Sequence, residues 1–405
     1  MTSPTLLPLL AVCLLTAQLA SGAEPPPTFR AVPFRIAVPE ATLTDLHRRL
    51  EQARLPPQPA GTAWALGPDQ QAVQDWLRAW RRFDWRAAER RLNALPQYTA
   101  VVDGVQLHFL HQPSAKPGAR ALILTHGWPD SFVRFLKVLG PLSAEFHVVV
   151  PSVPGYGFSD PRPRSSKETA ALWVKLMEGL GYRTFVAAGG DVGAGVTLEL
   201  ARHHADRVLA VHLTDVGWGP AQHDPASLSE AERNFLQRTE AWFQREGAYA
   251  MMHSTKPLTA AYGLNDSPAA LLAWAASFAN NAQATNEVDR LFGGREAFFT
   301  NLTVYWVTQT AGSAMAMYQL DAQAAWGGEP ASPGAAVRRP PVAIALFPGD
   351  AQFPREWAVR QGLDVRRFTL MPEGGHFAAA EVPALFTREL IAAFRELLDR
   401  RPTDR

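Results

Sequence analysis

Short apolar runs and longer segments with helical spacing alternate through much of the chain. Continuous apolar runs bounded by turn residues predict buried strands, and apolar residues at spacings of three and four predict helices. Strands are expected at Ala121–Thr125, His147–Val153, Thr184–Gly190, Val208–Thr214, Pro341–Phe347 and Val365–Met371. Helices are expected at about Phe132–Leu139, Lys167–Leu180 and Gly193–His204. This alternation predicts an α/β protein with a mostly parallel sheet that helices cover on both faces.

Upstream of residue 98 the pattern is helical. Glu40–Arg54 is amphipathic and ends before two prolines, and Asp69–Arg82 carries Trp76, Leu77 and Trp80 on one face. Such a face predicts a helix that packs on the body of the protein. The sequence then changes to strict alternation.

Two alternating segments flank an Asp-Gly pair. They are 98–102 and 105–111, and Asp103-Gly104 between them is a strong signal for a β-hairpin. His108 and His111 lie on its second strand, where we expect them to face solvent rather than take part in catalysis.

Between Trp218 and Arg339 the strand pattern stops. This part is rich in helix formers and aromatic residues, which predicts a helical cap over the carboxyl edge of the sheet, where open α/β folds bind ligands. The expected organisation is an amino-terminal extension at 24–97, the first part of the core at 98–217, the cap at 218–339 and the second part of the core at 340–405.

Charge and composition favour a small-molecule partner. Thirty-nine Lys and Arg oppose thirty-eight Asp and Glu in 405 residues, so no field of one sign indicates nucleic acid or an anionic membrane. Twelve Trp and twenty-one Phe offer side chains for an apolar pocket. No ligand cluster or phosphate-binding glycine loop is visible, so we expect neither a metal nor another cofactor. The oligomeric state stays open.

The apolar run Leu6–Ala20 is short for a membrane span and is followed by the small residues Ser21-Gly-Ala23. We expect residues 1–23 to be a signal peptide that is cleaved near Ala23, with export of the mature chain to the periplasm or the medium. The single cysteine, Cys13, falls within it. Because no Lys or Arg precedes the run, an uncleaved membrane anchor is the alternative.

Residues 187–196, AAGGDVGAGV, join an expected strand to an expected helix. In α/β-hydrolases this sharp turn presents the nucleophile, and glycines permit it. Here the residue presented is Asp191. Taken alone, the aspartate could also be a simple helix cap.

Two further motifs favour the catalytic interpretation. His126-Gly-Trp-Pro129 follows a strand at the place where this fold builds half of its oxyanion hole, and Gly374-Gly-His376 follows the last strand, where the fold carries its histidine. Asp350 and Asp215 each end a strand and could orient His376. We favour Asp350 because hydrolases more often place this acid after the later strand.

A carboxylate nucleophile suits displacement at a saturated carbon, which forms an alkyl ester. His376, held by Asp350, would then activate water, and the N–H groups of Val192 and Trp128 would bind the oxyanion. The leaving group could be a halide or the oxygen of an epoxide. An epoxide oxygen needs a proton donor such as a tyrosine, and a halide needs N–H donors that are often Trp side chains. The cap tyrosines, together with Val192 in place of Trp, favour an epoxide.

The chain resembles the microsomal and juvenile-hormone epoxide hydrolases over nearly all of its mature length. The resemblance is carried by short segments that look like family signatures: 32–36, 83–87, 92–96, 156–159, 254–257, 265–268, 305–306 and 376–379. It implies an α/β-hydrolase fold that converts an epoxide to a vicinal diol without a cofactor. It also implies that Asp191 is the nucleophile, His376 the base and Asp350 the charge-relay acid.

The resemblance further implies that Tyr249 and Tyr318 polarise the epoxide oxygen, and that Trp128 and Val192 contact the substrate. Relatives usually carry Trp directly after the nucleophile, so Val192 is expected to leave space beside Asp191. Two alternatives stay open from the sequence. They are a haloalkane dehalogenase with the same carboxylate, and a silent homologue that binds a small molecule without turning it over.

Overall fold

The computed structural model describes residues 29–217, 224–277, 288–326 and 339–399. Within these residues, nine strands form one sheet in the order β1-β2-β3-β5-β4-β6-β7-β8-β9. From β5 to β9 all neighbours are parallel, whereas β1, β2 and β3 add an antiparallel edge. The strands are β1 Val32–Pro33, β2 Gln97–Val102, β3 Val105–Gln112, β4 Arg120–Thr125, β5 Phe146–Pro151, β6 Phe185–Gly189, β7 Val208–Leu213, β8 Pro341–Leu346 and β9 Asp364–Leu370. The predicted strands are thus confirmed to within two residues at each end.

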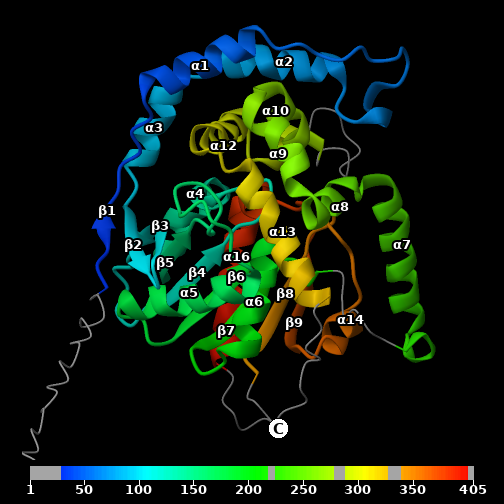
Figure 1. The fold of residues 1–405 in the computed structure, drawn as a ribbon. Coiled ribbons are helices and arrows are strands. Elements are labelled where there is room, and N and C mark those ends of the chain that lie inside the picture. Colours follow the sequence, from blue (N-terminus) through cyan, green and yellow to red (C-terminus); the bar gives the residue numbers. More distant parts are fainter. Residues whose placement is uncertain (1–28, 218–223, 278–287, 327–338, 400–405) are drawn as a thin grey trace, which may run out of the picture.

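Helices cover both faces of the sheet, as the continuous apolar strands require (Figure 1). Alternate residues of one strand enter opposite cores: Ile123 joins the cluster beneath α5 and α6, whereas Leu122 and Leu124 join the cluster beneath α4 and α16. The core helices are η2 Phe132–Phe135, α4 Leu136–Ser143, α5 Ser166–Gly179, α6 Val192–His203, α14 Arg355–Arg360, α15 Ala378–Glu381 and α16 Pro383–Asp399.

The predicted hairpin is present, but the prediction for one of its histidines is wrong. Asp103 and Gly104 both have positive φ, at 49° and 74°, as a tight two-residue turn requires. His108 is fully buried, because Phe34, Phe132 and Phe158 pack against its ring on that face of the sheet. Its ring nitrogens lie 2.9 Å from Ser152 Oγ and 3.0 Å from Gln97 Oε1, and burial lowers its pKa to about 3. His108 is therefore a neutral core residue.

The amino-terminal helices are α1 Glu40–Glu51, η1 Ala63–Leu66, α2 Gln70–Arg81 and α3 Trp85–Asn93. Figure 1 shows α1 and α2 lying across the cap helices α10 and α12 rather than on the sheet. The predicted apolar face of α2 makes this contact. Trp80 stacks on Phe299 at a centroid distance of 6.3 Å, and its Nε1 donates to Thr303 Oγ1 at 2.9 Å. The extension therefore supports the cap from above.

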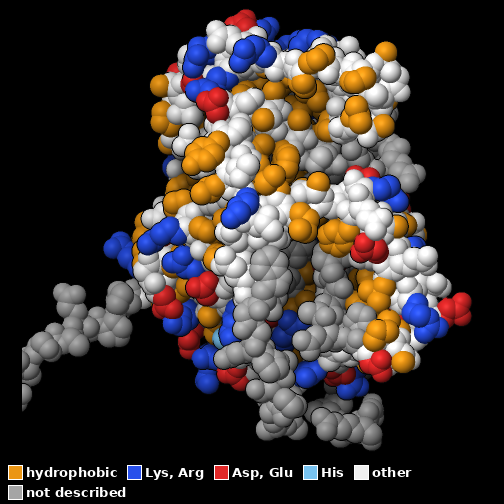
Figure 2. Space-filling view, turned by 45° about the vertical axis from the view of Figure 1, so that its right-hand side comes forward, with side chains coloured by type: hydrophobic (Ala, Val, Ile, Leu, Met, Phe, Trp, Pro, Cys, Tyr) orange, Lys and Arg blue, Asp and Glu red, His pale blue; other side chains and the backbone are white. Residues whose placement is uncertain are grey.

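The segment between β7 and β8 is helical, as predicted for the cap. Its described elements are η3 Pro225–Ser227, α7 Glu230–Glu246, α8 Ala248–Thr255, α9 Pro257–Asp266, α10 Pro268–Ala276, α11 Val288–Leu291, α12 Arg295–Thr308 and α13 Ala311–Trp326. Figure 2 shows hydrophobic side chains on the upper part of the molecule, where the extension and the cap lie. The exposed ones on α8 and α9 include Met251, Leu258 and Tyr262. Within the described ranges, no helix combines the length and the apolar character that a membrane span needs.

Candidate active site

Asp191 occupies the turn between β6 and α6, in a backbone conformation that residues other than glycine rarely adopt. Its φ is 59° and its ψ is −132°. The turn is possible because its neighbours lack side chains. A Cβ at Gly189 would overlap the carbonyl of Gly193, and one at Gly193 would overlap the carbonyl of Thr125. The glycines therefore permit the sharp turn that presents the carboxylate at the carboxyl end of the sheet.

The two oxygens of the Asp191 carboxylate have different surroundings. Oδ1 accepts hydrogen bonds from the backbone N–H groups of Trp128 at 2.8 Å and Val192 at 2.6 Å. Oδ2 lies 3.4 Å from His376 Nε2. A Cβ at residue 127 would overlap Oδ1, so Gly127 is what lets the loop after β4 approach so closely. One oxygen thus sits between two fixed donors and the other faces an imidazole.

Both candidate acids reach the site, but they contact different groups. Asp350, which follows β8, lies 3.1 Å from His376 Nδ1 through its Oδ1. Asp215, which follows β7, accepts the backbone N–H of Asp191 at 2.5 Å and that of Gly217 at 3.1 Å. The structure therefore places Asp350 on the imidazole and Asp215 behind the turn.

The pKa values of His376 and Asp215 are shifted by burial and by the neighbouring carboxylates. Burial alone would lower the pKa of His376, but the charges of Asp350 and Asp191 outweigh it and raise that pKa well above its usual value. Burial, reinforced by the negative charge of Asp350, raises the pKa of Asp215 to about 6. Among the described residues, no group of three or more His, Cys, Asp or Glu side chains is arranged to hold a metal ion.

The two cap tyrosines line the cavity into which the Asp191 carboxylate opens. Tyr318, on α13, places its hydroxyl 3.5 Å from Asp191 Oδ1, and Tyr249, on α8, lines the same cavity as Asp191. Burial and then the charge of Asp191 raise the pKa of both phenols. Both tyrosines therefore keep their protons at ordinary pH and can act as hydrogen-bond donors.

A cavity of about 960 Å³ joins the cap to the core above Asp191. It is near the upper end of the usual range for ligand pockets. Its walls are largely apolar and aromatic, from residues of α6, α7, α8 and the loops after β8 and β9: Leu198, Phe235, Trp242, Phe243, Met251, Phe353 and Phe377. Val192 lines it too, and beyond Val192 it continues along α6 past Gly195 and Leu198.

Trp128 is placed differently from Val192. Its side chain is only 1% exposed and lies outside the cavity lining, packed edge-on against His253 and Tyr305 with centroid distances of 5.0 and 5.3 Å. Only the backbone N–H of Trp128 faces the nucleophile.

Sequence reasoning missed His253. This buried residue packs its ring edge-on against Tyr249 and Tyr318, at 5.6 and 5.0 Å, and accepts a hydrogen bond from Trp274 Nε1 at 3.0 Å. Burial lowers its pKa to about 3, so it is neutral. Its spacing of four residues from Tyr249 on one helix was the signal available in the sequence.

Comparison with known proteins agrees with this geometry. The profile described as the epoxide hydrolase N terminus matches residues 31–135, and the profile of the alpha/beta hydrolase fold matches residues 120–323. A putative epoxide hydrolase of Stigmatella aurantiaca is 35% identical over 381 residues, which cover 90% of this chain and 85% of that protein. The chain belongs to the epoxide hydrolase family.

Other epoxide hydrolases match over similar lengths. Epoxide hydrolase 1 of Oryctolagus cuniculus is 29% identical over 417 residues, with 91% of this chain and 89% of the relative covered. The structure of Aspergillus niger epoxide hydrolase superposes with a TM-score of 0.78 at 29% identity, covering 91% of this chain and 97% of that one. These findings confirm the predicted α/β-hydrolase fold and the resemblance to epoxide hydrolases.

Proposed function

We propose that this epoxide hydrolase converts a bulky, largely apolar epoxide to a vicinal diol in two steps through an ester of Asp191. The observation that carries the proposal is the unequal environment of the carboxylate. Oδ1 is held by two backbone N–H groups, Oδ2 faces His376, and the hydroxyl-bearing Tyr249 and Tyr318 line the same cavity, with Tyr318 near Oδ1.

In the first step Oδ2 attacks an epoxide carbon. The bond between that carbon and the epoxide oxygen breaks, its electron pair goes to the oxygen, and Tyr249 and Tyr318 supply hydrogen bonds and a proton. Oδ1 becomes the carbonyl oxygen of the ester and stays between the N–H groups of Trp128 and Val192.

In the second step His376 takes a proton from water, which attacks the carbonyl carbon of the ester. Ester formation removes the charge of Asp191, one of the two anions that raise the pKa of His376, so the imidazole becomes more ready to act as a neutral base. Asp350 stabilises the imidazolium that forms, and the two N–H groups bind the oxyanion, an effect typically worth about 3 kcal/mol. When the intermediate collapses, the ester C–O bond breaks and the imidazolium gives its proton to the departing oxygen of the diol. The second proton of the water returns to the tyrosine that protonated the epoxide oxygen, so the Asp191 carboxylate, the neutral imidazole and the phenol are all restored.

The tyrosines distinguish an epoxide from a halide as the leaving group. The wild-type enzyme is expected to convert aliphatic or aryl epoxides to diols, and Tyr249→Phe with Tyr318→Phe should slow formation of the ester by about 10²- to 10⁴-fold, because the oxygen then leaves without a proton donor. Rapid-quench measurement of ester and diol checks this. Tyr262→Phe, at an exposed position of α9, is the matched control and should leave both unchanged. Halide release from haloalkanes without diol formation from epoxides would contradict the proposal, as would binding without any turnover.

Val192 is proposed to set the width of the pocket. Val192→Trp should fill the space that continues along α6 and lower kcat/KM for epoxides with large substituents, relative to small ones, by about 10- to 200-fold. Val192→Ala is the matched control, because it leaves the space open and should not discriminate against large substrates. Equal losses on small and large epoxides in Val192→Trp would indicate a disturbed turn at Asp191 instead.

We further propose that the chain is exported. The apolar run 6–20 and the cleavage site near Ala23 lie outside the described residues, so the proposal is supported by the sequence pattern alone. Sequencing of the mature amino terminus is expected to find a chain that begins near Glu24. A mature protein that retains Met1 would contradict cleavage.

A further inference from the structure

Below the catalytic residues lies a buried ion pair that the two-step scheme does not use. Asp130 and Arg134 come from the loop and the short 3-10 helix after β4, and their side chains are 3% and 2% exposed. Asp130 Oδ2 accepts from Arg134 Nη1 at 2.8 Å. Burial alone would raise the pKa of Asp130, but the charge of Arg134 and the neighbouring His126 together outweigh it and lower that pKa. Burying two charges is costly unless further hydrogen bonds compensate, so the other contacts of the pair are informative.

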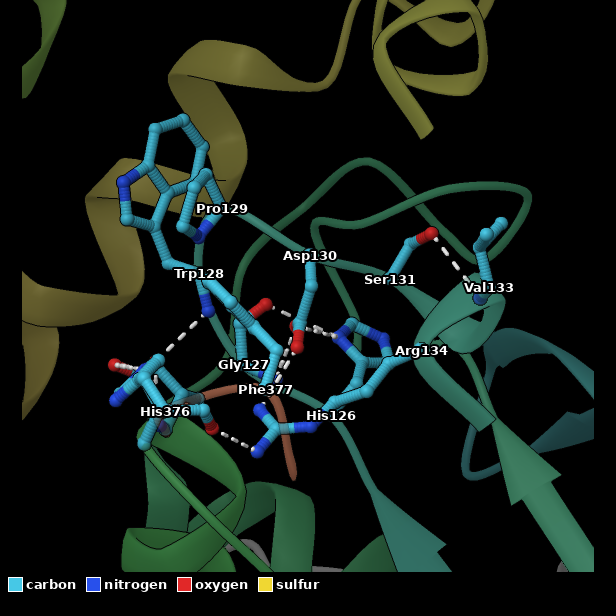
Figure 3. Close-up of polar contacts among 12 residues, drawn as sticks. His126, Gly127, Trp128, Pro129, Asp130, Ser131, Val133, Arg134, His376 and Phe377 are labelled. Carbon is cyan, nitrogen blue, oxygen red and sulfur yellow. Dashed lines mark hydrogen bonds and ion pairs between the residues drawn. The ribbon is translucent and has the colours of Figure 1, made fainter. Parts of the chain in front are cut away.

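Each partner of the pair also holds a backbone group of a different catalytic loop. Asp130 Oδ1 accepts the N–H of Gly127 at 2.7 Å, and Gly127 directly precedes the oxyanion donor Trp128. Arg134 Nη2 donates to the backbone carbonyl of His376 at 2.6 Å. Figure 3 shows Asp130 beside Gly127 and His126, with Arg134 reaching from Asp130 to the backbone of His376. The pair thus joins two loops that are far apart in the sequence.

The surroundings keep this bridge in place. The guanidinium of Arg134 lies 5.4 Å from the centre of the Phe377 ring, and Tyr305 Oη donates to the backbone carbonyl of Asp130 at 2.7 Å. The planar guanidinium can bond the carboxylate and the carbonyl at once through different nitrogens, which a lysine ammonium on a flexible chain does less well.

We propose that Asp130 and Arg134 are positioning residues that fix the base His376 relative to the oxyanion donor of Trp128, and that they thereby support hydrolysis of the ester more than its formation. The inference rests on the two-step function proposed above. Hydrolysis needs the imidazole, the attacking water and the oxyanion donors to be correctly placed relative to one another. Ester formation uses Asp191 Oδ2 and the cap tyrosines, which none of the hydrogen bonds of the pair described above reaches. The Trp128 N–H also contacts Oδ1 in that step, but the negative charge on Oδ1 decreases there and increases again only during hydrolysis, when the donor matters most.

The test is a single-turnover experiment with an epoxide, in which rapid quench and intact-protein mass spectrometry follow formation and decay of the alkyl-enzyme separately. Arg134→Lys should slow the decay by about 10- to 100-fold and leave formation within about twofold. Arg367→Lys is the matched control. It makes the same change in a less buried pair, in which Arg367 contacts Glu389 at 2.7 Å, and it should change neither step because the side chain of Arg367 bonds Glu389 and Glu396 on α16.

A second variant separates positioning from stability. Asp130→Asn with Arg134→Met removes both charges at similar volume, and such replacement of a buried pair often leaves stability unchanged. Asn can still accept from Gly127, but Met cannot bond the His376 carbonyl, so this double variant should fold normally and still hydrolyse the ester slowly. Recovery of normal decay in the double variant, or equal slowing of both steps in Arg134→Lys, would overturn the inference. A wild-type enzyme that forms diol with no alkyl-enzyme would instead contradict the two-step function, and the inference with it.

Discussion

Asp191→Ala is expected to reduce diol formation to a trace, with turnover falling by about 10⁴- to 10⁶-fold, the range seen when single members of a catalytic triad are removed. The change removes the oxygen that attacks the epoxide and leaves the N–H groups of Trp128 and Val192 without the carboxylate that they hold. Turnover measured with a broad panel of epoxides, together with circular dichroism to verify folding, checks the prediction.

Asp215→Asn is the matched control for this loss. Asp215 bonds the backbone of Asp191 but has no role as nucleophile or base in the scheme, and an amide oxygen can still accept that N–H. Its turnover should therefore fall far less than that of Asp191→Ala. Comparable losses in the two variants would mean that Asp191 acts through the shape of the turn and not through its carboxylate.

His376→Gln is expected to accumulate the ester of Asp191, the intermediate between the two steps. The first turnover should still form the ester, because Asp191 and the tyrosines are intact, whereas steady-state turnover should fall by about 10²- to 10⁴-fold because water has lost its base. Intact-protein mass spectrometry should show the enzyme heavier by the mass of one epoxide. The adduct should map to the peptide that contains Asp191.

His253→Gln serves as the control, since this histidine packs on the tyrosines but lies outside the contact between His376 and Asp191. It should accumulate no adduct. If His376→Gln shows none either, with a substrate that the wild type turns over rapidly, the base would not act on an ester of the enzyme.

Local patterns predicted the sheet because its central strands are apolar on both faces and are therefore nearly continuous in the sequence. The turn at Asp191 could be predicted for a similar reason, since the glycines that it needs are adjacent to it in the chain. Both features depend on neighbours in the sequence. The order of the strands in the sheet, and the segments that pack on it, depend instead on residues that are distant in the sequence.

His108 shows why contacts from distant segments could not be predicted. An alternating strand was expected to leave one face in solvent, but the ring of His108 packs against Phe34, Phe132 and Phe158, which come from three other segments. The choice between Asp350 and Asp215 had the same limit. Both end neighbouring strands, and only the positions of β7 and β8 beside His376 show which carboxylate reaches the ring.

The central claim is that water attacks an ester of Asp191 and not the epoxide itself. A single turnover in ¹⁸O-water, with enzyme in excess over epoxide, tests this directly. The account predicts that the heavy oxygen appears in the Asp191 carboxylate, detected by mass spectrometry of its peptide, and that the first diol formed carries none. Heavy oxygen in the diol of the first turnover, with an unlabelled Asp191, would contradict it.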